Sequence, residues 1–204
     1  MLRLTALTAA FAMILTAAPV SVMAAPEIGE PAPTFTAVTA DGETINIEEY
    51  RGQTVVLEWT NHECPFVVKH YETGNMQALQ KKATDNDVVW LTVVSSAPGK
   101  QGFVGAEKAQ ELMKEHNAHA SEKILDPTGE IGKLYDAQVT PHMYVIDAEG
   151  TLVYKGAIDD NSSASHDTVE GATNYVQAAL DALAAGEPVD PASTQPYGCS
   201  VKYM

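Results

Sequence analysis

Apolar runs and amphipathic stretches alternate along most of the chain, which is typical of an α/β protein. Thr54–Trp59 and Val88–Ser95 are nearly continuous, largely β-branched apolar runs, of the kind found in strands covered on both faces. Between them, Pro65–Lys82 has helical composition with an interruption at Glu72–Asn75. A strand, a helix and a strand in this order predict two parallel strands joined by a right-handed crossover.

Two hairpins are predicted from short runs on either side of polar turns. The first pairs Thr34–Ala37 with Thr44–Ile47 around the turn at Ala40–Gly42. The second pairs Met143–Asp147 with Leu152–Lys155 across a short polar turn. Strands joined through so few polar residues are antiparallel.

Helical spacing predicts further helices in the second half of the chain. One is expected at Ala106–His116, a helical turn is expected to end at Tyr135, and a closing amphipathic helix is expected at Thr168–Leu183. Ser165 or Asp167 is expected to cap the closing helix.

Together with a short strand near Lys123–Leu125, these elements predict one α/β domain over residues 25–185. Its expected architecture is a three-layer sandwich, with helices on both faces of a central mixed sheet and an N-terminal β-hairpin. The 204 residues are 45% hydrophobic and 19% charged, as in globular chains, and no internal repeat or second apolar core indicates another domain. Residues 186–204 contain three prolines and are expected to form an extended tail that carries Cys199.

The first 24 residues have the pattern of a secretory signal peptide. Arg3 precedes an uncharged apolar run from Leu4 to Val22, which ends in small residues before Pro26. A transmembrane anchor is the alternative, but the small residues and the lack of a basic stop favour cleavage near Ala24. We therefore expect an exported protein, periplasmic or secreted.

Cleavage would leave a strongly acidic chain. It removes one basic residue and no acid, so 11 basic and 27 acidic residues remain, with a formal charge of −16. Such a charge argues against nucleic-acid binding and against stable association with an anionic membrane surface.

Two cysteines follow the predicted signal segment, Cys64 and Cys199. In an oxidising compartment such a pair often forms one disulfide. A structural bridge across so long a loop would stabilise the fold by about 4 to 5 kcal/mol. Both alternatives therefore remain open: a structural disulfide that fixes the tail, and a redox-active cysteine pair.

Cys64 lies where a buried strand ends and a helix begins, in the segment LEWTNHECPFVVKH. Pro65 suits the first position of the helix. Unpaired amides and the helix dipole at such a terminus favour a thiolate and lower the thiol pKa. His62 is expected to add positive charge or take a proton, whereas Glu63 would oppose ionisation.

Cys64-Pro65 after a hydrophobic strand, followed about 75 residues later by Val139–Asp147 (VTPHMYVID), resembles the thioredoxin-like superfamily. More narrowly, the chain resembles its peroxiredoxin-like redoxin (AhpC/TSA-type) branch, from the N-terminal hairpin to Asp160. The resemblance implies a thioredoxin-like fold, no cofactor, and a redox-active Cys64. It also implies a cis Pro141 whose segment, with Thr140, lies against the sulfur.

The chain departs from the standard sites of this superfamily. Val67 occupies the fourth position of the thioredoxin C-x-x-C motif, so no local cysteine can resolve a mixed disulfide. The peroxiredoxin threonine and proline are replaced by Asn61 and Leu57, and Arg51 is the only arginine after residue 24. Cys199 is the possible resolving thiol. If peroxide is the substrate, Thr60, Asn61, His62, Lys69 or backbone amides would have to take the place of the family arginine.

The sequence thus favours an exported thiol oxidoreductase with Cys64 as nucleophile. Peroxide reduction and thiol–disulfide exchange remain balanced, so the partner is either a small oxidant or a protein thiol or disulfide, with an unknown reductant. The alternative is a non-catalytic module with a structural Cys64–Cys199 disulfide or a copper-binding role. The candidate ligands for such a metal are His62, Cys64, His70 and His142. Asp159 and Asp160 are expected to form a solvated hairpin end.

Overall fold

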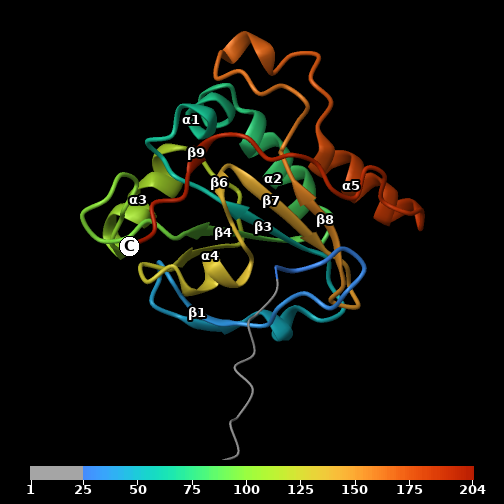
Figure 1. Cartoon of the computed structure of the whole chain (residues 1–204), viewed down its shortest axis with the longest axis horizontal. Coiled ribbons are helices and arrows are strands. Elements are labelled where there is room, and N and C mark those ends of the chain that lie inside the picture. Colours follow the sequence, from blue (N-terminus) through green and yellow to red (C-terminus); the bar gives the residue numbers. More distant parts are fainter. Residues whose placement is uncertain (1–24) are drawn as a thin grey trace, which may run out of the picture.

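The computed structural model describes residues 25–204 (Figure 1). The predicted signal peptide lies outside the described residues. Within them, no helix has the length and apolar character needed to cross a membrane.

Seven strands form one mixed sheet in the order β2-β1-β5-β4-β3-β7-β8, and β6 and β9 form a separate two-stranded ribbon (Figure 1). The strands are β1 Thr36–Thr39, β2 Thr44–Asn46, β3 Val55–Trp59, β4 Val89–Val94, β5 Glu122–Leu125, β6 Val139–Thr140, β7 His142–Ile146, β8 Leu152–Gly156 and β9 Cys199–Ser200. The helices are α1 Pro65–Glu72, α2 Asn75–Thr84, α3 Ala106–Glu115, α4 Glu130–Leu134 and α5 Tyr175–Ala185, with short 3-10 turns at Ile47–Tyr50 and His166–Thr168.

β3 is the central strand, parallel to β4 and antiparallel to β7. All five of its residues are buried, as the continuous apolar run predicts. Val55, Leu57 and Trp59 pack into the core on one face, whereas Val56 packs into the core on the other. The parallel crossover predicted between β3 and β4 is confirmed.

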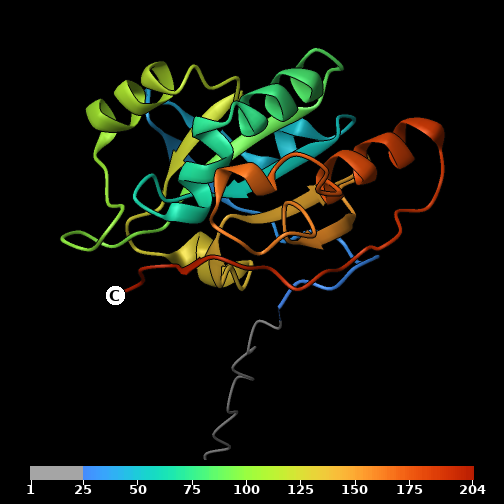
Figure 2. The same cartoon turned by 90° about the horizontal axis from the view of Figure 1, so that it is seen from above.

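Helices cover both faces of the sheet, so the predicted three-layer, thioredoxin-like α/β fold is confirmed. In Figure 2, α1, α2, α3 and α5 lie on one side of the sheet, and α4 lies on the other. The predicted hairpins are also present. The N-terminal one, β1–β2, continues the central sheet through antiparallel pairing of β1 with β5.

The closing helix begins later than the sequence analysis expects. α5 starts at Tyr175 rather than near Thr168, and its N-cap is Asn174, whose side-chain oxygen accepts the backbone N–H of Gln177 at 2.9 Å. The positive φ of Gly171 (82°) interrupts helical geometry before that point. Neither Ser165 nor Asp167 caps the helix, so both predictions are wrong.

The tail returns across the end of the sheet after α5 (Figures 1 and 2). It bridges to β8 through Ser193 and Lys155, pairs with β6 through β9, and places the Lys202 carbonyl against the backbone N–H of Ala97 at 2.8 Å. These backbone contacts bring Cys199 to the end of the sheet where β3 leads into α1.

Candidate active site

Cys64 is the N-cap residue of α1 and is fully buried, with 0% of its surface exposed. Its backbone is extended (φ −81°, ψ 122°), and Pro65 occupies the first turn of the helix, as the sequence predicts. The Cys64 N–H donates to the Asn61 carbonyl at 3.0 Å, and its carbonyl accepts the N–H of Val67 at 2.9 Å. The thiol is therefore held at the positive end of the helix dipole.

The loop before β7 lies directly against this sulfur. The Thr140–Pro141 peptide bond is cis, and the Cys64 thiol donates to the Thr140 carbonyl oxygen at 3.1 Å. Thr140 is buried, with 2% of its surface exposed. The two segments that carry the resemblance, 76 residues apart, meet at this hydrogen bond.

Cys199 reaches the same place from the tail. It is the antiparallel register partner of Thr140, whose hydroxyl donates to the Cys199 carbonyl at 3.5 Å. Both cysteines are free thiols, with Cys64 buried and Cys199 half-buried. One residue, Thr140, therefore contacts both.

The two thiols shift each other's ionisation in opposite directions. Burial opposes ionisation of Cys64. Hydrogen bonds from the side chains of Cys199 and Thr140 and from the backbone at Cys199 and Val67 outweigh it, so the pKa of Cys64 is lowered. Burial, the hydrogen bond with Cys64 and the charge of Cys64 raise the pKa of Cys199 to about 11. Cys64 is thus the first to become a thiolate, and Cys199 is the thiol that donates to it.

The candidate support residues lie close in sequence but differ in their contacts. Thr60 and Asn61 are buried, and the side-chain oxygen of Asn61 accepts the Glu63 N–H at 2.9 Å. Among residues 25–204, the Asn61 amide nitrogen is one of two buried side-chain atoms without a hydrogen-bond partner. Burial lowers the pKa of His62, so this imidazole is neutral at pH 7 and does not supply the expected positive charge. The Glu63 carboxylate turns away to accept the Gly102 N–H.

The candidate metal ligands do not converge. His70 lies on the second turn of α1 and His142 at the start of β7, and each makes its own hydrogen bonds: His70 with Asn75 and Tyr197, His142 with Tyr144. The described part of the chain holds no group of three or more His, Cys, Asp or Glu side chains placed to bind a metal ion. The copper-binding alternative therefore has no ligand set in residues 25–204.

The family assignment agrees with this geometry. The model of the family described as Redoxin matches residues 27–174, close to three quarters of the chain. The chain belongs to the redoxin family. The predicted membership of the thioredoxin-like superfamily is confirmed. The matched span holds Cys64, Thr140 and Pro141 but not Cys199, whose place in this redoxin is known from the structure alone.

Solved structures share the fold. A hypothetical protein from Sinorhizobium meliloti superposes with a TM-score of 0.74 at 20% identity, covering 89% of this redoxin and 97% of that chain. An uncharacterized conserved protein from Geobacillus kaustophilus gives 0.73 at 25% identity, covering 87% and 93%. A secreted disulfide oxidoreductase from Mycobacterium tuberculosis gives 0.50 at 20% identity, covering 67% and 92%. No curated protein matches this sequence significantly.

β3 also carries a buried carboxylate, Glu58, that was not among the candidate residues. Glu58, on β3, is 0% exposed and accepts hydrogen bonds from Trp90, Tyr71 and Gln80 at 2.9 to 3.1 Å. Burial raises the pKa of Glu58 against the lowering effect of these donors. The signal available in the sequence was a lone acid inside the apolar run TVVLEW.

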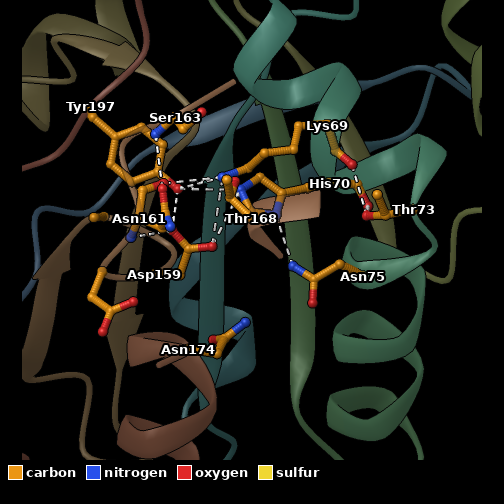
Figure 3. Close-up of polar contacts among 12 residues, drawn as sticks. Lys69, His70, Thr73, Asn75, Asp159, Asn161, Ser163, Thr168, Asn174 and Tyr197 are labelled. Carbon is orange, nitrogen blue, oxygen red and sulfur yellow. Dashed lines mark hydrogen bonds and ion pairs between the residues drawn. The ribbon is translucent and has the colours of Figure 1, made fainter. Parts of the chain in front are cut away.

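Asp159 is a second buried carboxylate, and its burial differs from the prediction. Asp159 is 2% exposed, so the prediction of a solvated hairpin end is wrong for this residue, although Asp160 is exposed. Asp159 faces Lys69 and His70 of α1, with Nζ and Nε2 each 3.8 Å from its Oδ2, and the Tyr197 hydroxyl donates to its Oδ1 (Figure 3). Lys69, a candidate support residue for Cys64, is therefore committed to this cluster.

Proposed function

We propose that this redoxin is an exported thiol–disulfide oxidoreductase that alternates between the Cys64 and Cys199 dithiol and a Cys64–Cys199 disulfide. The observation that carries the proposal is the pairing of Cys199 with Thr140, whose carbonyl accepts the Cys64 thiol. This pairing supplies, from the tail, the second thiol that the CPFV motif lacks. The fold similarity to a secreted disulfide oxidoreductase supports the same reaction class.

The first chemical step is assigned to Cys64. Its lowered pKa favours the thiolate, and the start of α1 stabilises that charge. The Cys64 thiolate attacks one sulfur of a partner's disulfide, so that a Cys64–partner disulfide forms and the partner's own S–S bond breaks. The second partner sulfur leaves as a thiolate and takes up a proton.

The second step is assigned to Cys199. While Cys64 is ionised, its charge helps to keep the pKa of Cys199 near 11. Formation of the mixed disulfide removes that charge, so the pKa of Cys199 falls at the moment when a second thiolate is needed. Cys199 then attacks the Cys64 sulfur, the remaining partner thiolate leaves, and two electrons have passed from this redoxin to the partner. The reverse sequence oxidises a partner dithiol.

Peroxide reduction is the second candidate, favoured by the lowered pKa of Cys64. Attack on a peroxide would give a Cys64 sulfenic acid and an alcohol or water, and condensation with Cys199 would release water and form the same disulfide. The charges near the site favour disulfide exchange instead. Arg51, the only arginine in the described residues, bonds the Glu149 carbonyl at the β7–β8 turn, and Lys69 is held by Asp159.

The test uses the protein comprising residues 25–204, as wild type, Cys64→Ser and Cys199→Ser. Each reduced protein is equilibrated with mixtures of oxidised and reduced glutathione and mapped by mass spectrometry. We expect one Cys64–Cys199 disulfide in wild type, a Cys64–glutathione disulfide in Cys199→Ser, and little modification in Cys64→Ser. A wild type that forms no Cys64–Cys199 disulfide would overturn the proposal.

A stopped-flow arm separates the two candidate reactions. Reduced wild type is mixed with hydrogen peroxide, and thiol loss is compared with that of a free cysteine. Consumption no faster than the free thiol supports disulfide exchange. Fast consumption that depends on Cys64 would instead assign peroxide reduction to the same thiol pair.

A further inference from the structure

Three side chains form a buried polar cluster beside α1 (Figure 3). Lys69 and His70 come from adjacent positions of α1 and are 0% exposed, and Asp159 follows β8 and is 2% exposed. A buried lysine and a buried aspartate are costly to desolvate unless all of their hydrogen-bonding capacity is used. The cluster therefore needs partners from outside α1.

The tail supplies one of these partners. The Tyr197 hydroxyl donates to Asp159 Oδ1, lies 3.4 Å from Lys69 Nζ, which donates to it, and lies 3.3 Å from His70 Nε2. The phenol ring packs edge-on to Phe66, with centroids 5.8 Å apart, and Lys69 Nζ stands 5.3 Å from its centroid. Tyr197 thus inserts both its hydroxyl and its ring against one face of α1.

The protonation of His70 suits this arrangement. Burial and the charge of Lys69 lower the pKa of His70 to about 3, so the ring is neutral at pH 7. Asn75 Nδ2 lies 2.8 Å from His70 Nδ1 and donates to it, which assigns the ring proton to Nε2, facing Tyr197. The Tyr197 hydroxyl thus contacts Lys69 and His70 of α1 and also Asp159, which follows β8.

We propose that Tyr197 is a latch that positions Cys199 against Cys64. The proposal rests on the proposed function, because it assigns a role to the residues that place the resolving thiol. Only Gly198 separates Tyr197 from Cys199, so the seated phenol restricts where the Cys199 sulfur can lie. Tyr197, Lys69, His70 and Asp159 act through the tail and are positioning residues.

The latch also controls access to Cys64. With the tail seated, Cys64 is 0% exposed, although a partner disulfide must reach its sulfur. The partner reacts with the open population, in which the tail has left β6. Loss of the hydrogen bonds that the Tyr197 hydroxyl makes to this cluster raises that population by at least about tenfold.

The test measures how fast iodoacetamide alkylates Cys64 in the reduced protein comprising residues 25–204. Mass spectrometry follows each cysteine separately. In Tyr197→Phe, which keeps the ring and removes the hydroxyl, we expect Cys64 alkylation about tenfold faster than in wild type. Asp159→Asn, which keeps an acceptor oxygen but removes the carboxylate, should accelerate it as well. The double variant should be less than additive, because both changes weaken the same contact between Tyr197 and residue 159.

Tyr135→Phe is the matched control. Its hydroxyl is also buried and bonded, to the Pro33 carbonyl at 2.6 Å, but it makes no hydrogen bond to the tail. Equal Cys64 alkylation in Tyr197→Phe and wild type, or equal acceleration by Tyr135→Phe, would overturn the latch. Failure of the proposed function is seen separately, as a wild type that forms no Cys64–Cys199 disulfide with glutathione.

Discussion

Gly198 lies directly against the carbonyl oxygen of Thr140. A β-carbon on residue 198 would stand 2.0 Å from that oxygen, and the backbone φ of Gly198 is +137°. No L-residue fits this space without moving the strand pair. The close approach lets β9 pair with β6 while the same carbonyl accepts the Cys64 thiol.

Gly198→Ala is therefore expected to displace the tail from β6. The equilibrium constant for Cys64–Cys199 disulfide formation in glutathione mixtures should fall at least about tenfold, because the conformation that brings the two thiols together is less populated. Gly186→Ala is the matched control, since Gly186 also has a positive φ (69°) but open space around its Cα. Unchanged disulfide formation in Gly198→Ala would show that the β6–β9 pairing does not position Cys199.

The pKa of Cys64 should depend on the donor at position 199. Among the effects that lower it, the hydrogen bond from the Cys199 side chain is the largest. We expect the pKa of Cys64 to rise in Cys199→Ala and to rise less in Cys199→Ser, which keeps a hydroxyl donor. The pH dependence of thiolate absorbance measures this directly. Identical titrations in the two variants would exclude a hydrogen bond from residue 199.

Buried His142 should make the fold sensitive to acid. Burial lowers the pKa of His142 to about 3, and its Nδ1 accepts the backbone N–H of Gln138 at 3.3 Å. The unfolded chain binds this proton first, near the ordinary pKa of about 6.5, so stability is lost as pH falls from there toward 3. The loss is expected to be about 1.4 kcal/mol per pH unit for this one group.

Urea unfolding at a series of pH values measures this loss. His142→Asn, whose side-chain oxygen can replace Nδ1 as acceptor, should be less stable than wild type near neutral pH but should show a shallower fall in acid. His166→Gln changes an exposed histidine and should leave the slope unchanged. A slope in His142→Asn equal to that of wild type would assign the acid sensitivity to other groups.

The sequence-based predictions succeeded where local pattern decides the structure. The runs around Val55–Trp59 and Val89–Val94 are long and apolar enough that only central strands bury them, and Pro65 after Cys64 marks a helix start. They failed where a loop competes with a helix. The expected helix included the segment before Tyr175, but Gly171 and the cap at Asn174 delay the helix.

Contacts between segments that are distant in the chain could not be predicted from the sequence. The local sequence around Asp159 is typical of a solvated turn. Asp159 is nevertheless buried, because Lys69 of α1 and Tyr197 of the tail contact its carboxylate. Glu58 has the same character, as an acid within an apolar strand whose three donors come from other elements. Burial of a polar group depends on partners that no local pattern reveals.

Residues near one another in the chain were enough to predict the fold class, the position of Cys64 at a helix start and the lack of a local second cysteine. That Cys199 is the neighbour of Cys64 follows only from the folded arrangement of the tail. The reason is that the tail is positioned by pairing with Thr140 and by the Tyr197 hydroxyl in the Asp159 cluster, contacts that exist only once the sheet and α1 have formed.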